Sequence, residues 1–240
     1  MTVLEIDMVD RRHTDREYEN ELAQLRERVL LMGARVEEMM TASRKAFAER
    51  DAALARNTIR NDHQIDQLEV EIDELCLQVL ARRQPVASDL RFITATLKLV
   101  TDLERIGDLC VNMCERVVEL CDDPTYPTQG PLPRIGETAQ AMLHDVLDAF
   151  VAGDATKAEQ VIERDSVVDA YYAQLFPELV AHMMSDPTVV FRSTRMLSMG
   201  KYIERIADHA TNIGELVVFM VRGLDVRHTG PASNGPGPSA

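Results

Sequence analysis

Four pairs of acidic residues recur in this sequence, and within each pair the two acids are four residues apart. The pairs are Asp62 and Asp66, Glu104 and Asp108, Asp165 and Asp169, and Glu204 and Asp208. In a helix, side chains at this spacing lie on one face, and like charges there repel each other. Carboxylate oxygens are the ligands that Mg²⁺, Mn²⁺, Ca²⁺ and, in multinuclear sites, iron accept in proteins. The sequence therefore predicts that these eight carboxylates bind metal.

The acidic pairs also have a simpler interpretation, as parts of helix surfaces that are merely exposed to solvent. A single acidic pair on an outer helix face usually has that role. Duplication in register favours metal binding, because a solvated face gives no reason to keep residue type, although common descent could preserve some identities without function. Arg105 and Arg205 lie between the acids, where they could orient the carboxylates or form ordinary surface ion pairs.

Three other polar residues close to the acidic pairs could support a metal site. Asn112 and Asn212 follow the last acid of their motifs by four residues, and could hydrogen-bond a ligand carboxylate or a bound water, or be exposed polar residues. His209 adjoins Asp208 and could join the site, but a surface histidine is the more common role. A buried di-iron centre is disfavoured, because it needs Glu-x-x-His motifs and the sequence has none.

The acidic pairs belong to an internal repeat. Between positions 47 and 66, seven of the twenty residues are identical to those 103 positions later, and between 98 and 117, seven of twenty are identical to those 100 positions later. The change of offset falls in the turn expected before the third helix of each copy. The sequence therefore predicts two copies of one unit.

Helical periodicity predicts three helices in each copy and no strand. The expected helices are 15–49, 51–83, 88–121, 135–151, one from 154, and one from 187. We expect Asp51 to be an N-cap, Pro85 to end the second helix, and Ser88 or Asp89 to cap the third. Asp186, followed by proline, is the expected start of the sixth helix.

The predicted fold is all-α, with two tandem three-helix bundles joined by a linker that is rich in proline. The expected parts are a flexible N-terminus (1–16), the first bundle (17–121), the linker (122–133), the second bundle (134–222) and a disordered tail (223–240). The tail is rich in Gly, Pro and Ser and has little apolar surface to bury.

Composition and charge disfavour several classes of protein. The net charge of −14 argues against nucleic-acid binding and suits cations or a basic partner. The four cysteines show no CxxC spacing and are expected to be reduced; Cys110 and Cys114, one helical turn apart, are expected to be small core residues rather than part of a disulfide or a thiolate metal site. Because no apolar run is long enough to span a bilayer and no signal peptide opens the chain, we expect a cytoplasmic protein that meets membranes only through partners.

The sequence gives no sign of an enzyme. It contains no Gly-rich phosphate loop, no GxSxG, no HExxH and no EF-hand. A metal held by carboxylates could still activate water. However, no general acid or base is evident beside the acidic pairs, so we do not expect catalysis.

Several motifs resemble those of the PhoU family. They are "LERIGD" (103–108) and "IERIAD" (203–208), together with "ARRQPVASDLR" (81–91), "MLHDVLDAF" (142–150) and "FRS" (191–193). The resemblance extends from about Leu22 to Gly223, with the duplicated motifs in the right order. One departure is Ala207, where the first copy has Gly107. This exchange of one small residue for another leaves the acids in place.

The resemblance implies a regulator with a PhoU-like fold whose E(D)xxxD motifs bind metal clusters on the bundle surface. These motifs correspond to the four acidic pairs, and the metal is expected to be Fe, Mn, Mg or Zn. The resemblance further implies an adaptor that acts on the ATPase subunit of a phosphate ABC transporter and on a phosphate-sensing histidine kinase. It would repress the phosphate-starvation response and restrain uptake when phosphate is plentiful, and we expect a homodimer.

Two alternatives to this function stay open from the sequence. One is a metal-independent helical adaptor whose acidic faces bind basic partner surfaces directly. The other is a metal-dependent hydrolase.

Overall fold

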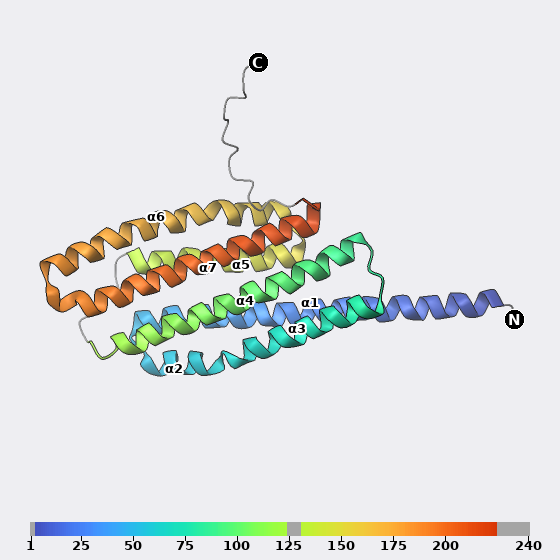
Figure 1. Ribbon diagram of the computed structural model, residues 1–240, viewed down its shortest axis with the longest axis horizontal. Coiled ribbons are helices and arrows are strands. Elements are labelled where there is room, and N and C mark those ends of the chain that lie inside the picture. The colour runs from blue at the N-terminus through green and yellow to red at the C-terminus, as the bar shows by residue number, and fades with distance from the viewer. Residues whose placement is uncertain (1–2, 124–130, 225–240) are drawn as a thin grey trace, which may run out of the picture.

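The computed structural model describes residues 3–123 and 131–224, with side chains described from residue 16 onward. Within these ranges the chain is helical and contains no strand (Figure 1). The elements are α1 (Val3–Glu49), α2 (Ala52–Asn61), α3 (His63–Arg82), α4 (Ala87–Leu120), α5 (Pro131–Ala152), α6 (Ala155–Ser185), a 3₁₀ turn η1 (Pro187–Val189) and α7 (Val190–Arg222). The predicted all-α class is confirmed.

The helices form two three-helix bundles that lie side by side. In the first, α1 and α4 pack against each other and against α2 and α3, and in the second α5, α6 and α7 all pack together. The helix ends reproduce the repeat offsets: α3 ends at Arg82 and α6 at Ser185, 103 positions later, while α4 and η1 begin 100 positions apart, at Ala87 and Pro187. The repeat read from the sequence is therefore also a repeat of structure.

Matching N-caps begin the middle helix of each bundle. Asp51 Oδ1 accepts hydrogen bonds of 2.9 Å from the backbone N–H groups of residues 53 and 54. Asp154 Oδ1 makes the equivalent 3.0 Å bonds to residues 156 and 157. The predicted cap at Asp51 is confirmed. At Asp186 the carboxylate likewise caps, but the first turn after it is the 3₁₀ turn η1.

Three predicted boundaries were wrong. α1 begins at Val3, well before residue 15, because no Gly or Pro interrupts the polar segment, and Figure 1 shows its first turns extending beyond the bundles.

The N-cap of α4 is Val86, without a side-chain hydrogen bond, while Asp89 accepts a 2.9 Å bond from the hydroxyl of Tyr18. α5 begins at Pro131, inside the predicted linker. The rest of the linker (124–130) and the tail from residue 225 lie outside the described residues.

The predicted second helix is interrupted at Asp62, which separates α2 from α3. Around this residue the backbone makes short-range bonds, from Asp62 N to Ile59 O at 3.4 Å and from Ile65 N to Asp62 O at 2.7 Å. The local sequence "NTIRND" is rich in residues with low helix propensity, whose side chains compete for backbone hydrogen bonds. The equivalent stretch of α6 lacks most of these residues, and α6 is continuous.

Helical periodicity predicts one apolar stripe on each long helix, and the core follows these stripes. The predicted residues are all buried except Leu75, which is half-buried: Leu22, Leu25, Val29, Met32, Val36 and Met39 on α1, Ile65, Leu68, Ile72, Leu75 and Val79 on α3, Leu99, Leu103, Ile106, Cys110, Met113 and Val117 on α4, and Ile203, Ile206, Ala210, Ile213 and Val217 on α7. Cys76, Cys110 and Cys114 are buried, and all four cysteines are free, as predicted. Burial raises the pKa of Cys76 and of Cys114 to about 12, so these thiols stay protonated at neutral pH. In the described residues no helix is long and apolar enough to cross a membrane.

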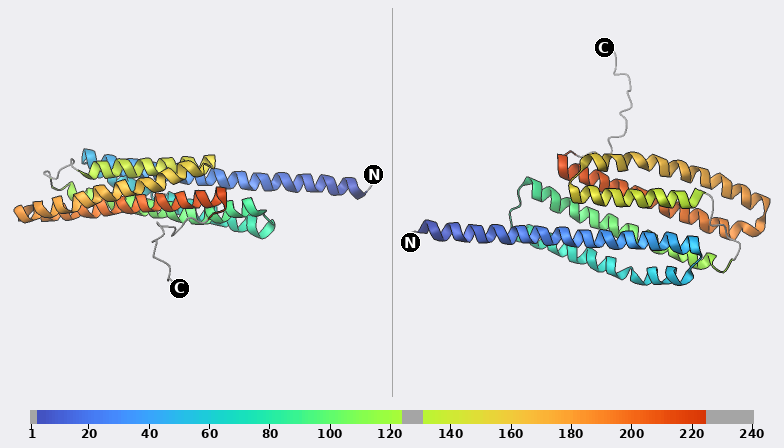
Figure 2. Two further views of the ribbon diagram at one scale, coloured as in Figure 1. Left: turned by 90° about the horizontal axis from the view of Figure 1, so that it is seen from above. Right: turned by 180° about the vertical axis from the view of Figure 1, so that it is seen from behind.

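Two antiparallel helix pairs join the bundles, α4 with α7 on one face and α1 with α5 on the other (Figure 2). On the α4–α7 face, Asp102 Oδ1 lies 2.8 Å from His209 Nδ1. On the α1–α5 face, a row of polar side chains crosses the seam. The sequence did not predict which helix faces meet, because every helix of a bundle has an outer face that could serve.

Candidate functional site

The eight predicted ligands form two clusters, one in each bundle. In the first cluster Asp62 and Asp66, at the start of α3, lie beside Glu104 and Asp108 on α4. In the second, Asp165 and Asp169 on α6 lie beside Glu204 and Asp208 on α7. The structure thus brings together the pairs that the sequence placed on adjacent helices, through the close packing of α3 on α4 and of α6 on α7. We refer to these groups as the first and second carboxylate clusters.

Within the first cluster the acids are near enough to raise each other's pKa. Partial burial, with the charges of Asp66 and Asp108, raises the pKa of Asp62 to about 6. Burial and the charge of Asp108 also raise the pKa of Glu104, whose side chain is only 18% exposed. Gly107 packs against the start of α3: a Cβ there would lie 3.1 Å from Ile65 Cδ1 and 3.4 Å, an ordinary van der Waals distance, from Asp62 Oδ1.

The second cluster has the same electrostatic character. Partial burial, with the charges of Asp208 and Asp169, raises the pKa of Asp165 to about 6. Loss of solvation and the charge of Glu204 raise the pKa of Asp208. The Glu204 side chain is 15% exposed. In each bundle, therefore, one glutamate of the cluster is mostly covered, which a fully solvated acidic face would not require.

Each cluster is partly neutralised by a basic side chain of its own helix. Arg105 contacts both acids of its motif, with Nε 3.4 Å from Glu104 Oε2 and Nη1 3.3 Å from Asp108 Oδ2. In the second cluster Lys201 Nζ lies 2.5 Å from Glu204 Oε2. Neither cation contacts all the acids of its cluster in these ion pairs, so each cluster retains negative charge.

The chemistry of the donor set fits a hard cation, because each cluster offers several carboxylate oxygens from two helices. With the side chains as they lie, however, no group of three or more His, Cys, Asp and Glu residues among the described residues is arranged to hold a metal ion. The clusters are thus collections of suitable ligands on fixed helices, and the carboxylates would have to rotate to meet a common ion.

Two further acids enlarge the first cluster. Glu69 and Asp73 follow Asp62 and Asp66 along the same face of α3, which we call the acidic ridge of this helix. Burial together with the charge of Asp73 raises the pKa of Glu69. Asp73 Oδ1 is buried and has no hydrogen-bond partner in the part of the chain that the structure describes. The sequence places both residues on the ridge, but the repeat gave no reason to add them to the ligand set, because the second copy has no acid at these positions.

The residues predicted to support the second cluster take part in the contact between the bundles. His209 Nδ1 and Asn212 Nδ2 lie 2.8 and 3.3 Å from the same oxygen, Asp102 Oδ1. The structure thus directs Asn212 towards Asp102 on α4. Asn112, its counterpart, is half-buried on α4.

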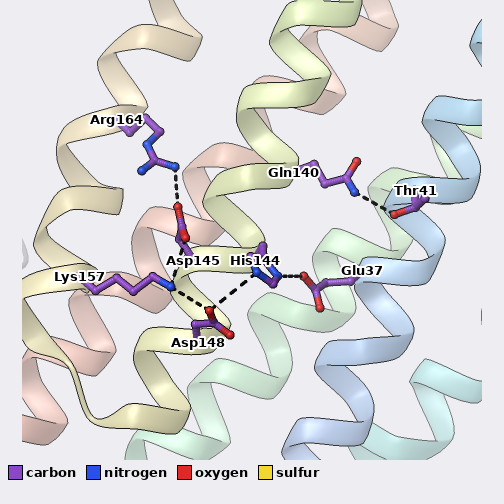
Figure 3. A network of polar contacts seen from close by, with 8 residues as sticks. All are labelled: Glu37, Thr41, Gln140, His144, Asp145, Asp148, Lys157 and Arg164. Atoms are coloured by element: carbon purple, nitrogen blue, oxygen red, sulfur yellow. Dashed lines mark hydrogen bonds and ion pairs between the residues drawn. The ribbon is translucent and has the colours of Figure 1, made fainter.

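A second polar network holds α1 against α5, and Figure 3 shows it from close by. His144 Nδ1 lies 2.8 Å from Glu37 Oε1, and Gln140 Nε2 donates a 2.9 Å bond to Thr41 Oγ1. The hydrogen bond to Glu37 raises the pKa of His144, which favours the charged imidazolium at this seam. Within the second bundle, Asp145 accepts a 2.7 Å bond from Arg164 and so joins α5 to α6. The contacts of Glu37 and Thr41 with α5 fix the relative position of the bundles, and none of these bonds involves either carboxylate cluster.

The raised pKa of Asp62 predicts a pH-dependent stability in metal-free protein. A carboxyl with a folded-state pKa near 6 and an unfolded value of about 3.9 stabilises the fold below about pH 4, and this contribution is lost as the pH rises through 6. We expect Asp62→Asn to be more stable than the parent by roughly 1 kcal/mol at pH 7, after allowance for solvent screening of a half-exposed group.

By the same linkage, this advantage should fall to about half at pH 5 and nearly vanish at pH 4. Urea unfolding of both proteins at the three pH values, in chelator-treated buffer, measures the difference. An advantage of equal size at every pH would show that Asp62 is not titrating in this range.

The family model and the curated relatives that match this chain all point to one family. The family model described as "PhoU domain" matches residues 29–117 and 132–217, one match in each bundle. A curated relative from Pseudomonas putida, named as a phosphate-specific transport system accessory protein PhoU homolog, is 41% identical over 91% of this chain and 86% of its own length. The Escherichia coli protein of the corresponding name is 35% identical, with 91% of each chain covered.

Solved structures agree with the sequence relatives. A crystal structure of PhoU from Pseudomonas aeruginosa has a TM-score of 0.83 and 41% identity, covering 86% of this chain and all of that one. A phosphate transport system regulatory protein PhoU from Streptococcus pneumoniae has a TM-score of 0.81 and 31% identity, covering 87% of this chain and 99% of that one. The two family-model matches, at residues 29–117 and 132–217, include all eight acids of the carboxylate clusters.

Proposed function

Because this chain belongs to the PhoU family, we propose that it is a cytoplasmic accessory protein of a phosphate-specific transport system. It acts as an adaptor and has no enzymatic activity of its own. The observation that carries the proposal is the match of both bundles, over nearly their whole length, to proteins that bear this name. Its partners are the ATPase subunit of the phosphate ABC transporter and the phosphate-sensing histidine kinase, and the active form is a homodimer.

In this proposal the adaptor keeps the starvation response off and restrains uptake when phosphate is plentiful. Long rigid helices suit such a role, because they present fixed faces to two partners at once. The acidic surface, with a net charge of −14, favours partner surfaces that are basic.

We further propose that the carboxylate clusters bind divalent or trivalent cations, Fe, Mn, Mg or Zn. Asp62, Asp66, Glu104 and Asp108 would hold one group of ions. Asp165, Asp169, Glu204 and Asp208 would hold the other. The bound cation supplies positive charge that offsets the repulsion among the carboxylates, and so stabilises the packing of the helices that carry them. The donor chemistry and the raised pKa values of Asp62 and Asp165 support this role.

Deletion of the gene tests the regulatory role. We expect a deletion strain to express phosphate-starvation genes in medium with abundant phosphate, because the adaptor that represses the kinase is missing. A reporter fused to a starvation promoter measures the effect, and a plasmid copy of the parent gene is the control that should restore repression. Unchanged reporter activity in the deletion strain would contradict the proposed function.

Two measurements separate the alternative functions. Inductively coupled plasma analysis of protein purified without chelator distinguishes a metal-binding adaptor from a metal-independent one, which would contain no stoichiometric metal. An assay with phosphate esters and added Mn²⁺ tests for a hydrolase. Turnover that disappears when Glu104 and Asp108 are replaced would favour that alternative, since carboxylate-bound metals can activate water.

A further inference from the structure

The two carboxylate clusters differ at a pair of positions that are in contact in each bundle. By the repeat offsets, Thr101 corresponds to Lys201 and Glu69 corresponds to Tyr172. In the first bundle Thr101 lies close enough to the Glu69 carboxylate to favour its charged form, while the Thr101 hydroxyl donates a 3.3 Å hydrogen bond to Leu97 O. In the second bundle Lys201 Nζ lies 5.8 Å from the centre of the Tyr172 ring. The contact is thus kept, while an acid and a neutral hydroxyl are replaced by an aromatic ring and a cation.

A third exchange acts in the same direction. Asp73, which adds to the charge of the first cluster, corresponds to Phe176 in the second, and Phe176 is 54% exposed. The first cluster therefore has six carboxylates, because Glu69 and Asp73 add to its four predicted ligands. On the equivalent faces of α6 and α7, the second cluster has only its four predicted ligands. The negative charge to be neutralised is larger in the first bundle.

The internal cations of the clusters are not equivalent either. Lys201 reaches Glu204 at 2.5 Å, and that carboxylate is mostly covered, so water screens the ion pair only in part. Arg105 makes longer contacts of 3.3 and 3.4 Å; its side chain is 55% exposed against 49% for Lys201, so the two cations differ in contact distance rather than in exposure. The second cluster therefore has both less negative charge and the closer internal cation.

We propose that Lys201 is the built-in counter-ion of the second carboxylate cluster and makes that cluster the weaker of the two sites for an added cation. An incoming ion must displace the ammonium group from Glu204 or share the carboxylate with it. Because the ammonium is attached to the same helix, its effective concentration at Glu204 stays high. This inference rests on the cation binding put forward under the proposed function.

A titration of the full-length, chelator-treated protein with Mn²⁺ tests the proposal, with unbound Mn²⁺ measured by its electron paramagnetic resonance signal. We expect two classes of sites in the parent protein. Glu104→Gln with Asp108→Asn should remove the tighter class, and Glu204→Gln with Asp208→Asn the weaker class. This assignment is independent of any change at Lys201.

The decisive variants exchange the two equivalent positions. Lys201→Thr should tighten the weaker class roughly two- to fivefold, the effect of one partly screened charge pair. Thr101→Lys should weaken the tighter class by a similar factor. Both positions are exposed, and each new residue is the one that the other bundle already carries, so folding should be retained. Unchanged affinities in both variants would overturn the proposal.

A metal-free measurement separates this inference from the cation binding on which it rests. In urea unfolding without metal, Lys201→Thr should destabilise the parent protein but not a protein that already carries Glu204→Gln. Equal effects in both backgrounds would show that Lys201 is not the counter-ion of Glu204. If no variant binds Mn²⁺, the proposed cation binding and the ranking of the sites are both wrong, while this comparison still decides the role of Lys201.

Discussion

A protein that carries both Glu104→Gln and Asp108→Asn should bind less metal than the parent. With metal present the variant should be less stable than the parent, whereas without metal it should be equally stable or more stable. With metal present, the parent gains stability by mass action, about 2.7 kcal/mol at a hundredfold excess over the dissociation constant. For a chain of this size that corresponds to a rise of roughly 5 to 10 °C in the melting temperature. The double variant should lose the part of this rise in melting temperature that comes from metal bound at the first cluster.

Without metal, the same substitutions should be neutral or stabilising. The reason is that the charge of Asp108 repels both Asp62 and Glu104 and contributes to their raised pKa values. Thermal melts of parent and variant, with a chelator and with added Mn²⁺ or Fe, give the four values required. A matched control removes two exposed acids outside both clusters, through Glu27→Gln with Glu178→Gln.

The control variant should keep the metal content and the metal-dependent rise of the parent, because it changes net charge by the same amount without touching a ligand. If the cluster variant behaves like the control in every condition, the acidic ridges are ordinary solvated faces. In that case the duplication of Glu104 and Asp108 would reflect common descent alone.

Replacing Ile106 or Ile206 by Ala should destabilise the fold by about 2 to 5 kcal/mol, the range found when a large aliphatic side chain is removed from a packed core. Each isoleucine lies between the two acids of its motif in the sequence, and each is 0% exposed. These side chains hold α4 and α7 against their own bundles, and thereby fix where the acids stand. Urea unfolding of each variant measures the loss.

Leu77→Ala is the control for the core variants, since this leucine is 60% exposed and its removal should change stability by no more than about 0.5 kcal/mol. At temperatures where the core variants remain folded, their metal content should equal that of the parent, because no ligand has changed. A loss below about 1 kcal/mol at both isoleucines would contradict the packing described for α4 and α7.

The parts of the fold that the sequence predicted are those set by local chemistry and by the repeat. The cap at Asp51, the stop before Pro85 and the buried stripe on α4 each depend on residues within a few turns of one another. Because the repeat carries the same signals twice, the second bundle could be predicted from the first. The adjacency of the acidic pairs also followed, since neighbouring helices of a small bundle must pack.

The failures came from contacts between distant parts of the chain and from weak helix signals. Asp89 was an acceptable cap by sequence, but in the fold its carboxylate accepts the hydroxyl of Tyr18. The break at Asp62 depends on a balance of low helix propensities that periodicity does not measure. The contact of His209 with Asp102 required knowing that α7 docks on α4, and no local pattern carries that information.

If the duplicated acidic pairs are cation sites held by two repeated bundles, crystals soaked in Mn²⁺ should hold manganese at both clusters. Anomalous diffraction recorded at the manganese absorption edge locates that manganese. We predict anomalous peaks within reach of Asp62, Asp66, Glu104 and Asp108, with weaker peaks in the second cluster. Well-ordered carboxylates without an anomalous peak at either cluster, in crystals that contain millimolar Mn²⁺, would show that the acidic pairs are not cation sites.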